Sequence, residues 1–375
     1  MVDLATKTLL HDKLRFLITV SGVAFAVTLV FVQVGLFLGL MDNASLTIDH
    51  IDADLWVTSR NTPNIDFAHE FPETYVNRVR SIEGVATADN LIVWFMNVSL
   101  PSGAVEGTEV YAMSDFAKWN FPPGLVEGNV ADLRRGPYFI LDDSAKKRWG
   151  DFKPGDYREI LGRRLKIIGR TIEAKSFTTT PLTFMDIRLA QSLNQGDLRG
   201  NTTYILVKLA PGANASVVAE AIRRRLPYND VYTRDEWASR SRKYWVDSTG
   251  LGLNMYITVF LGCLVGVVVV AQTLYTSAME HVREFGTVKA IGGGNWDIYR
   301  ILAKQATVAA VAGFALGALQ TAAIRPLMEK IDLKLIIPNP LFVAVFIGSI
   351  LLCLAASMLS FQKVASIDPA LVFRT

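Results

Sequence analysis

Residues 16–40 of this chain of 375 residues read "FLITVSGVAFAVTLVFVQVGLFLGL". This segment holds no charged side chain. A helix crosses the hydrocarbon core of a bilayer, which is about 30 Å thick, with about 20 apolar residues. The apolar part of a signal peptide is shorter, about 7–15 residues, and no convincing small-residue cleavage site follows this run. The segment therefore predicts an uncleaved first membrane-spanning helix.

Three further runs carry no charged residue, namely 248–279, 305–324 and 337–362. Charged residues make up 19% of the whole chain, against about 25% in soluble domains. A single run of this kind could be a buried helix of a soluble protein, but four such runs are typical of a membrane protein. We therefore predict an α-helical membrane protein with four transmembrane helices.

The orientation of the spans follows from the Lys and Arg residues in their short flanks, which are more frequent on the cytoplasmic side. Such residues precede the first run, separate the second from the third, and follow the fourth: Lys7, Lys13, Arg15, Arg283, Lys289, Arg300, Lys304, Lys363 and Arg374. The loop between the third and fourth runs weakens this bias with Arg325, Lys330 and Lys334. Both termini are still predicted to be cytoplasmic, with the long second segment outside.

The predicted organisation has eight parts. They are an N-terminal cytoplasmic segment with the first span (1–41), an extracytoplasmic domain (42–247), the second span (248–279), a cytoplasmic loop (280–304), the third span (305–324), an outer loop (325–337), the fourth span (338–361) and a cytoplasmic tail (362–375). Both cysteines, Cys263 and Cys353, fall inside spans. The extracytoplasmic domain therefore needs no disulfide and must fold on its own core.

Each end of the extracytoplasmic domain has the pattern of strand, helix, strand. At the first end these are "ADLWVTS", "FPETYVNRVRSIEG" and "VATADNLIVWFMNVSL"; at the last end they are "TTYILVKL", "PGANASVVAEAIRRRLP" and "NDVYTR". Two such units pack as a split βαβ sheet with helices on one face. The middle, about 101–201, is rich in turn signals. We expect a large α+β domain with a mainly β subdomain inserted at 101–201.

Common catalytic and ligand-binding motifs are absent from the sequence. It contains no G-x-x-x-x-G-K-[ST] loop for nucleotide phosphates and no G-x-S-x-G nucleophile motif. The four histidines are far apart and lack the spacing of metal ligands: His11, His50, His69 and His281. The acidic cluster around His50 is better explained as a solvated turn. We predict no catalytic, cofactor-binding or metal-binding residue, so any ATP must be bound by another chain.

Pairs of glycines recur in the spans at a spacing that lets two helices approach closely. The pairs are Gly35 with Gly39, Gly262 with Gly266, and Gly313 with Gly317. One such pair is a weak signal, but three pairs in four spans predict a tight helix bundle or a dimer. No charge lies in the middle of a span, which argues against an ion relay through the membrane.

The loop between the second and third spans contains "MEHVREFGTVKAIGGGNWDIYRILAKQ", residues 279–305. A helix over 279–291 would place Val282, Phe285 and Val288 on one apolar face. Gly292–Gly294 would end it, and Asn295 would cap the next helix with Asp297 in its first turn. On composition alone, an ordinary amphipathic loop at the membrane surface is the favoured explanation.

The same segment resembles the coupling-helix region of FtsX/MacB-type ABC transporter permeases in "REFGTVKAIGGGNWDIYRIL". The end of the chain, "SIDPALVFR", is similar to the closing motif of that family. The start, "LLHDKLRFLITVSGVAFAVTLVFVQVGLF", resembles the DevC-type branch, in which the ATPase is a separate chain. The resemblance covers the whole chain and implies a MacB-like periplasmic domain between the first two spans.

The resemblance implies that the chain is a non-catalytic permease subunit of the inner membrane. Two copies would join two copies of a cytoplasmic ATPase, which binds ATP and Mg²⁺, and would transmit its motion outward to export a substrate. It would contact the ATPase through Glu280, Arg283, Glu284, Phe285, Gly286, Lys289, Ala290 and Gly292, with a tail motif at Asp368, Pro369 and Arg374. A periplasmic adaptor and an outer-membrane channel stay open as further partners. Two alternatives also stay open: a regulator of an extracytoplasmic enzyme, and a scaffold without an ATPase.

Overall fold

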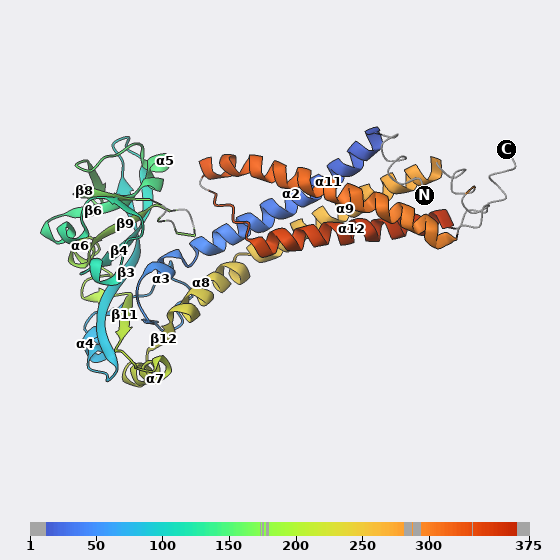
Figure 1. The fold of residues 1–375 in the computed structure, drawn as a ribbon. Coiled ribbons are helices and arrows are strands. Elements are labelled where there is room, and N and C mark those ends of the chain that lie inside the picture. Colours follow the sequence, from blue (N-terminus) through green and yellow to red (C-terminus); the bar gives the residue numbers. More distant parts are fainter. Residues whose placement is uncertain are drawn as a thin grey trace. The chain divides into compact units, whose positions relative to one another are not determined.

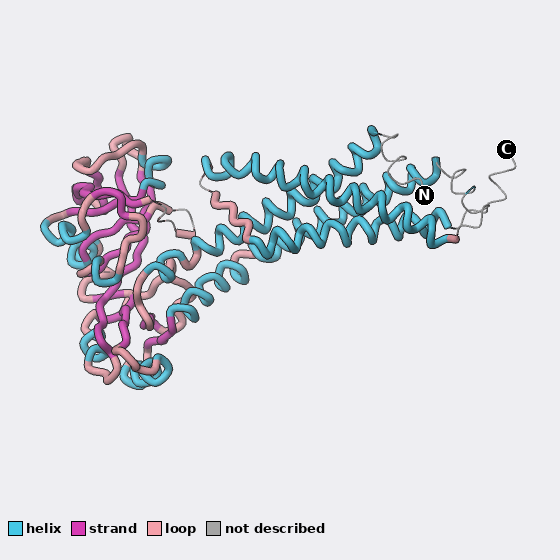
Figure 2. Tube along the Cα trace, viewed as in Figure 1, coloured by secondary structure: helices cyan, strands magenta, loops and turns pink. Residues whose placement is uncertain are grey.

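The computed structural model describes residues 13–172, 174, 176, 177, 180–280, 287, 294–331 and 333–365. The chain forms two compact units (Figures 1 and 2). The helical unit comprises Met1–Gly39 with Leu251–Thr375, and the sheet unit comprises Leu40–Gly250. Each unit is described by itself below.

The helical unit contains the four helices that are long and apolar enough to span a membrane within the described residues. They are α2 (Lys13–Asn43), α9 (Leu251–Glu280), α11 (Asn295–Lys330) and α12 (Asn339–Ala365). Figure 1 shows α9, α11 and α12 running alongside one another, and α12 packs against both of the others. The predicted number of transmembrane helices is confirmed.

Aromatic rings join three of these helices. The ring of Phe31 in α2 lies 5.9 Å from that of Phe314 in α11 and 5.7 Å from that of Phe342 in α12. The rings of Phe314 and Phe342 are 5.0 Å apart. Since Phe31 is only 1% exposed, this cluster forms the centre of the helical unit, where dispersion contacts rather than water exclusion hold helices together.

The third membrane helix extends beyond its expected bounds at both ends. It was expected at 305–324, whereas α11 runs through Asn295–Lys330 and includes Pro326. The expected bounds were those of the uncharged run. Backbone hydrogen bonds do not depend on side-chain charge, so the helix extends into the charged residues on both sides of the run. Arg325 Nε also donates to Glu329 at 3.0 Å, one turn later, which stabilises this end.

The first part of the sheet unit is an antiparallel sheet in the order β12–β1–β11–β3. The strands are β1 (Leu55–Ser59), β3 (Val85–Ser99), β11 (Tyr204–Leu209) and β12 (Asn229–Thr233), with helices α4 (Tyr75–Arg80) and α7 (Ala215–Arg225) between them. Apolar residues of both helices pack with Leu55, Val57 and Ile205 in one core. This arrangement confirms the predicted split βαβ fold.

The predicted insertion is mainly β and extends the same sheet. It contributes β4 (Val105–Met113), β5 (Leu125–Glu127), β6 (Tyr138–Asp142), β7 (Tyr157–Ile160), β8 (Arg163–Thr171) and β9 (Leu182–Asp186). The long strand β3 pairs with β11 on one side and with β4 on the other, and β9, β6, β8 and β5 follow in that order. The short elements are η1 (Ala117–Trp119), η2 (Val130–Arg135), η3 (Asp143–Ala145), α5 (Lys146–Trp149), α6 (Ile187–Leu193), α3 (Leu46–His50) and the paired strands β2 (Phe71–Pro72) and β10 (Asn201–Thr202).

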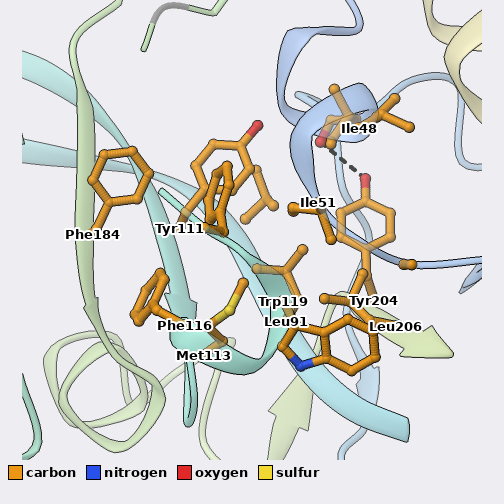
Figure 3. Close-up of a cluster of buried hydrophobic side chains, with 14 of the residues drawn as sticks. Ile48, Ile51, Leu91, Tyr111, Met113, Phe116, Trp119, Phe184, Tyr204 and Leu206 are labelled. Carbon is orange, nitrogen blue, oxygen red and sulfur yellow. Dashed lines mark hydrogen bonds between the residues drawn. The ribbon is translucent and has the colours of Figure 1, made fainter. Parts of the chain in front are cut away.

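A second core lies where the two parts of the sheet meet (Figure 3). Phe184 of β9 packs against Phe116 and Tyr111, with ring centroids 6.2 Å apart in both pairs. The hydroxyl of Tyr204 donates to the Ile65 carbonyl at 2.9 Å. Because buried aromatic rings from both parts of the sheet share one continuous core, the two parts form a single folded unit.

The uncharged run 248–279 is not one continuous helix. Helix α8 (Arg234–Ser248), which begins with a capping box between Thr233 and Glu236, ends before α9 begins at Leu251. Gly250 lies between them with φ +69°, a left-handed conformation that glycine adopts without steric cost. Gly252, by contrast, lies inside α9.

Candidate functional site

The candidate site is the end of the helical unit that carries the loop between α9 and α11. Seven of the eight residues predicted to contact an ATPase lie outside the described residues: Arg283, Glu284, Phe285, Gly286, Lys289, Ala290 and Gly292. The tail residues Asp368, Pro369 and Arg374 also lie outside them. Glu280 is described, and it is the last residue of α9. The structure therefore describes the helix ends that precede and follow the loop.

An ion pair joins two helices at this end of the unit. Arg15, in the first turn of α2, donates from Nη2 to Oε1 of Glu280 at the end of α9. The Arg15 side chain is 28% exposed and that of Glu280 is 54% exposed. An exposed pair of this kind adds about 0–1 kcal/mol to stability, so it links the last turn of α9 to the first turn of α2 while contributing little to folding.

A small apolar cluster holds three helix ends together around the loop. Ala278 of α9 packs with Ile298 and Leu302 of α11, all within 1% exposure, and Phe361 of α12 contacts this cluster. The Ser360 hydroxyl donates to the Ala271 carbonyl at 2.8 Å and links α12 to α9. The two helices that flank the loop, α9 and α11, are thus packed against each other directly. A displacement of the loop can therefore be transmitted to α9, α11 and α12.

The first turn of α11 presents aromatic side chains that the sequence analysis did not single out. Trp296 is 61% exposed, its ring stacks on Tyr299 at 5.1 Å, and the guanidinium of Arg300 lies 5.6 Å from it. The N-cap of α11 is Gly294, one residue before the expected cap Asn295, and its amide donates to Asp297 Oδ2 at 2.9 Å. The signal was the run "NWDIYR", in which Trp and Arg are spaced four residues apart.

The six glycines predicted to allow close packing all face neighbouring chain segments in the helical unit. A Cβ at Gly262 or Gly266 of α9 would lie 2.7 Å from Leu29 or 2.9 Å from Ala26. A Cβ at Gly313 or Gly317 of α11 would lie 2.5 Å from Val23 or 2.8 Å from Val27. The glycines of both helices therefore face α2.

The third glycine pair packs against a non-helical segment rather than against another helix. A Cβ at Gly35 would lie 2.8 Å from Leu335, and one at Gly39 would overlap the carbonyl group of Lys334. The amide of Ile336 donates to the Gly35 carbonyl at 3.1 Å. The absence of side chains on this face of α2 lets the extended chain before α12 lie directly on the helix.

The sheet unit contains a buried pair of carboxyl groups that the sequence analysis missed. Glu109 of β4 is 0% exposed and Asp66 is 4% exposed. Burial raises the pKa of Asp66 to about 6, and burial followed by the nearby Asp66 charge raises the pKa of Glu109 well above its usual value. Trp245 Nε1 donates to Asp66 Oδ2 at 3.2 Å. Alternation along β4 gives no sign that a Glu points inward, so sequence could not reveal the pair.

Two family models match the chain. The model described as "MacB-like periplasmic core domain" covers residues 16–225, more than half of the chain, and the model described as "FtsX-like permease C-terminal" covers residues 256–369. The chain belongs to the FtsX/MacB family of ABC transporter permeases.

Similar proteins carry the same description. An uncharacterized ABC transporter permease of Mycobacterium bovis is 25% identical over 379 residues, covering 100% of this permease and 99% of the relative. A second one, from Mycobacterium tuberculosis, is 26% identical over 389 residues with the same coverage. Both relatives therefore share the length and order of parts of this permease.

Solved structures of extracytoplasmic domains are also similar to the permease. The periplasmic region of MacB from Actinobacillus actinomycetemcomitans matches with a TM-score of 0.39 and 13% identity, over 50% of the permease and 92% of that chain. The extracellular domain of the noncanonic ABC-type transporter YknZ from Gram-positive bacteria matches with a TM-score of 0.36 and 12% identity, over 48% and 98%.

The family assignment and the four apolar helices agree on the general class of the protein. It is a membrane protein with a large extracytoplasmic domain of the MacB type, and it is the permease component of an ABC transporter. Within the described residues, no three His, Cys, Asp or Glu side chains are grouped so that they could hold a metal ion.

Proposed function

We propose that two copies of this permease join two copies of a separate cytoplasmic ATPase in the inner membrane, and that the permease transmits ATP-driven motion to its extracytoplasmic domain to export a substrate. The partner ATPase binds ATP and Mg²⁺, and the permease contributes no catalytic residue. The observation that carries the proposal is the FtsX-like match over 256–369, which covers the loop between α9 and α11, all of α11, and α9 from residue 256 onward.

The packing around this loop suits a mechanical role. Ala278, Ile298 and Leu302 fasten the helix on each side of the loop to the other, and the Arg15–Glu280 pair ties α9 to α2. Close-packed side chains transmit displacement because the interior has little free volume to absorb it. A force on the loop therefore moves the helix ends together rather than bending the loop alone.

The proposed contacts with the ATPase are on the loop and its flanks. Phe285 is an aromatic anchor in a pocket of the ATPase, Arg283 and Glu284 make polar contacts, and Gly286 and Ala290 permit close approach. The remaining predicted contacts are Glu280, Lys289 and Gly292. Trp296 joins this set, because it is exposed in the first turn after the loop.

The direct test is identification of the proteins that stay bound to the permease. The tagged permease is purified in a mild detergent from cells that express it at native levels, and the copurifying chains are identified by mass spectrometry. We expect a soluble ABC ATPase in one-to-one ratio with the permease. A permease that purifies without any nucleotide-binding protein, and whose ATPase activity is zero in native membranes, would contradict the proposal.

A further inference from the structure

A cavity of about 650 Å³ lies in the inserted part of the sheet unit. Its walls come from η2, the start of β8, the end of β9 and α6. The elements β8, β9 and α6 lie close together in Figure 1. The cavity lies within the size range of small-molecule sites, about 300–1,000 Å³. Two buried leucines, Leu133 and Leu189, form part of its wall.

Four arginines line this cavity, whereas only one carboxylate does. The arginines come from three separate segments, and they are Arg134, Arg135, Arg163 and Arg188; the carboxylate is Asp186. The Oδ1 atom of Asp186 already accepts a hydrogen bond from the backbone amide of Arg188 at 2.9 Å. The lining therefore carries a clear excess of positive charge.

The charges of two of these arginines are not neutralised by an acid of the described residues. Arg163 Nη1 donates to the neutral hydroxyl of Ser192 at 2.7 Å, which holds the guanidinium in place without cancelling its charge. The side chain of Arg188 makes no hydrogen bond or ion pair with a described residue. By contrast, Arg134 pairs with Asp115 at 3.4 Å and Arg135 pairs with Asp132 at 2.9 Å.

Some other arginines of the sheet unit do have acidic partners. Arg80 pairs with Asp89 at 2.8 Å, and Arg170 pairs with Asp143 at 3.2 Å. Arg163 and Arg188 thus bring two charges without an acidic partner in the described part of the chain to one hollow of the surface. Charges of one sign at a concave site raise the local concentration of ligands of the opposite sign.

We propose that this arginine-lined cavity binds a phosphate-bearing ligand, either a soluble phosphate compound or a phosphorylated lipid headgroup. The planar guanidinium matches the oxygens of phosphate with two parallel hydrogen bonds. A phosphate group carries about −1.5 to −2 charges, so one group can neutralise both Arg163 and Arg188, whereas one carboxylate cannot. The proposal is independent of the coupling to an ATPase, because all of its residues lie in the sheet unit.

The test uses the full-length permease in phosphatidylcholine nanodiscs at low salt. One arm titrates inorganic pyrophosphate by calorimetry, with succinate as a carboxylate comparator. The other arm measures cosedimentation with phosphatidylcholine vesicles that contain phosphatidic acid, against vesicles of phosphatidylcholine alone. The variant is Arg163→Gln with Arg188→Gln. The matched control, Arg78→Gln with Arg224→Gln, removes the same charge from helices α4 and α7, outside the cavity.

We expect the double variant to weaken binding at least about tenfold, while the control stays close to wild type. Each lost hydrogen bond between a guanidinium and a phosphate oxygen is worth more than about a factor of ten in affinity.

Loss of binding in the pyrophosphate arm identifies a soluble ligand, and loss in the vesicle arm alone identifies a lipid headgroup. Both results support the site. Equal weakening by the control, no binding in either arm, or succinate binding as tightly as pyrophosphate would overturn it. If the double variant misfolds, the binding measurement is repeated with Arg188→Gln alone. The Arg188 side chain makes no hydrogen bond or ion pair with another described residue, so this substitution should not disturb the fold.

Discussion

Arg15 and Glu280, which are 265 positions apart in the sequence, form an ion pair between the first turn of α2 and the last residue of α9. Glu280 directly precedes the loop that we propose contacts the ATPase. The pair therefore connects the helix that enters the extracytoplasmic domain to the proposed site of ATPase contact.

Reversing one charge of this pair should impair coupling more than stability. In Arg15→Glu two carboxylates face each other, which displaces the end of α9, while the cost in unfolding free energy stays about 1 kcal/mol or less for so exposed a pair. We expect a lower ATPase rate in reconstituted permease–ATPase complexes. The double variant Arg15→Glu with Glu280→Arg restores the attraction and should recover the rate. A double variant as slow as the single one would show that the pair itself does not matter.

Adding a methyl group at Gly313 should destabilise the helix bundle. Its Cβ would lie 2.5 Å from Val23 and 3.1 Å from the Val20 carbonyl of α2, so the helices must separate. Overpacking of this kind costs about 1–3 kcal/mol. Gly313→Ala should therefore lower the thermal unfolding midpoint in detergent.

The matched control for this glycine is Gly348 in α12, where an added Cβ meets nothing within 4 Å. Gly348→Ala should leave the midpoint unchanged or raise it slightly, since alanine favours helix by about 1 kcal/mol. If both substitutions lower the midpoint equally, the close approach of α11 to α2 is not what Gly313 provides.

The buried Asp66–Glu109 pair should make the permease less stable as the pH rises. The folded pKa of Asp66, about 6, lies above its ordinary value of 3.8 because burial disfavours the charged form. Its favourable contribution is then complete below pH 3.8 and is lost as the pH rises through about 6. The pKa of Glu109 is raised in the same direction. Between pH 5 and pH 7 the unfolding midpoint of the extracytoplasmic domain should therefore fall.

Asp66→Asn isolates this effect, because asparagine keeps an oxygen for the Trp245 indole and carries no charge. The variant should show a smaller fall of the midpoint between the two pH values than wild type. Glu220→Gln, at an exposed position of α7, serves as the control and should keep the wild-type dependence. An Asp66→Asn profile that overlays wild type would assign the pH dependence to other groups.

The topology predicts opposite labelling at two positions. A cysteine at Ser102, in the turn between β3 and β4, should react with an impermeant thiol reagent in intact cells, whereas one at Gly293 should react only after the membrane is opened. The two native cysteines are replaced by serine for this measurement. Labelling of Gly293→Cys from outside would invert the proposed orientation.

The sequence was sufficient for the membrane spans and for the ends of the extracytoplasmic domain, because both depend on local patterns. Uncharged runs fixed α2, α9, α11 and α12, and the strand–helix–strand patterns matched β1–α4–β3 and β11–α7–β12. Helix bounds were less accurate: the third span was ended at Ile324, although α11 continues past Pro326. Hydropathy identifies the part of a helix that lies in the lipid, whereas the helix ends where its backbone hydrogen bonds stop.

Features that depend on long-range packing could not be predicted. The Arg15–Glu280 pair joins residues 265 positions apart, and the Asp66–Glu109 pair is brought together by the fold of the sheet unit. The four arginines of the cavity come from segments that strand pairing of β6, β8 and β9 brings to one place. No local periodicity signals such encounters, whereas the glycines and the loop after α9 were visible as short motifs.

Contact between the loop after α9 and an ATPase is tested by the double substitution Phe285→Ala with Glu284→Lys. Both residues lie outside the predicted spans, so folding and membrane insertion should be unchanged. An aromatic anchor costs about 2 kcal/mol or more when it is truncated. Leu319→Ala, at a position 67% exposed on α11, is the control and should behave as wild type.

The measurement is copurification of the nucleotide-binding subunit with tagged wild-type, control and double-variant permease, together with coupled ATPase rates. We expect the double variant to lose the subunit, or to retain it with hydrolysis no longer coupled to transport. A loop that only rests on the membrane surface would instead bind anionic lipid more tightly after Glu284→Lys. Equal copurification and equal ATPase rates in all three proteins would contradict the account.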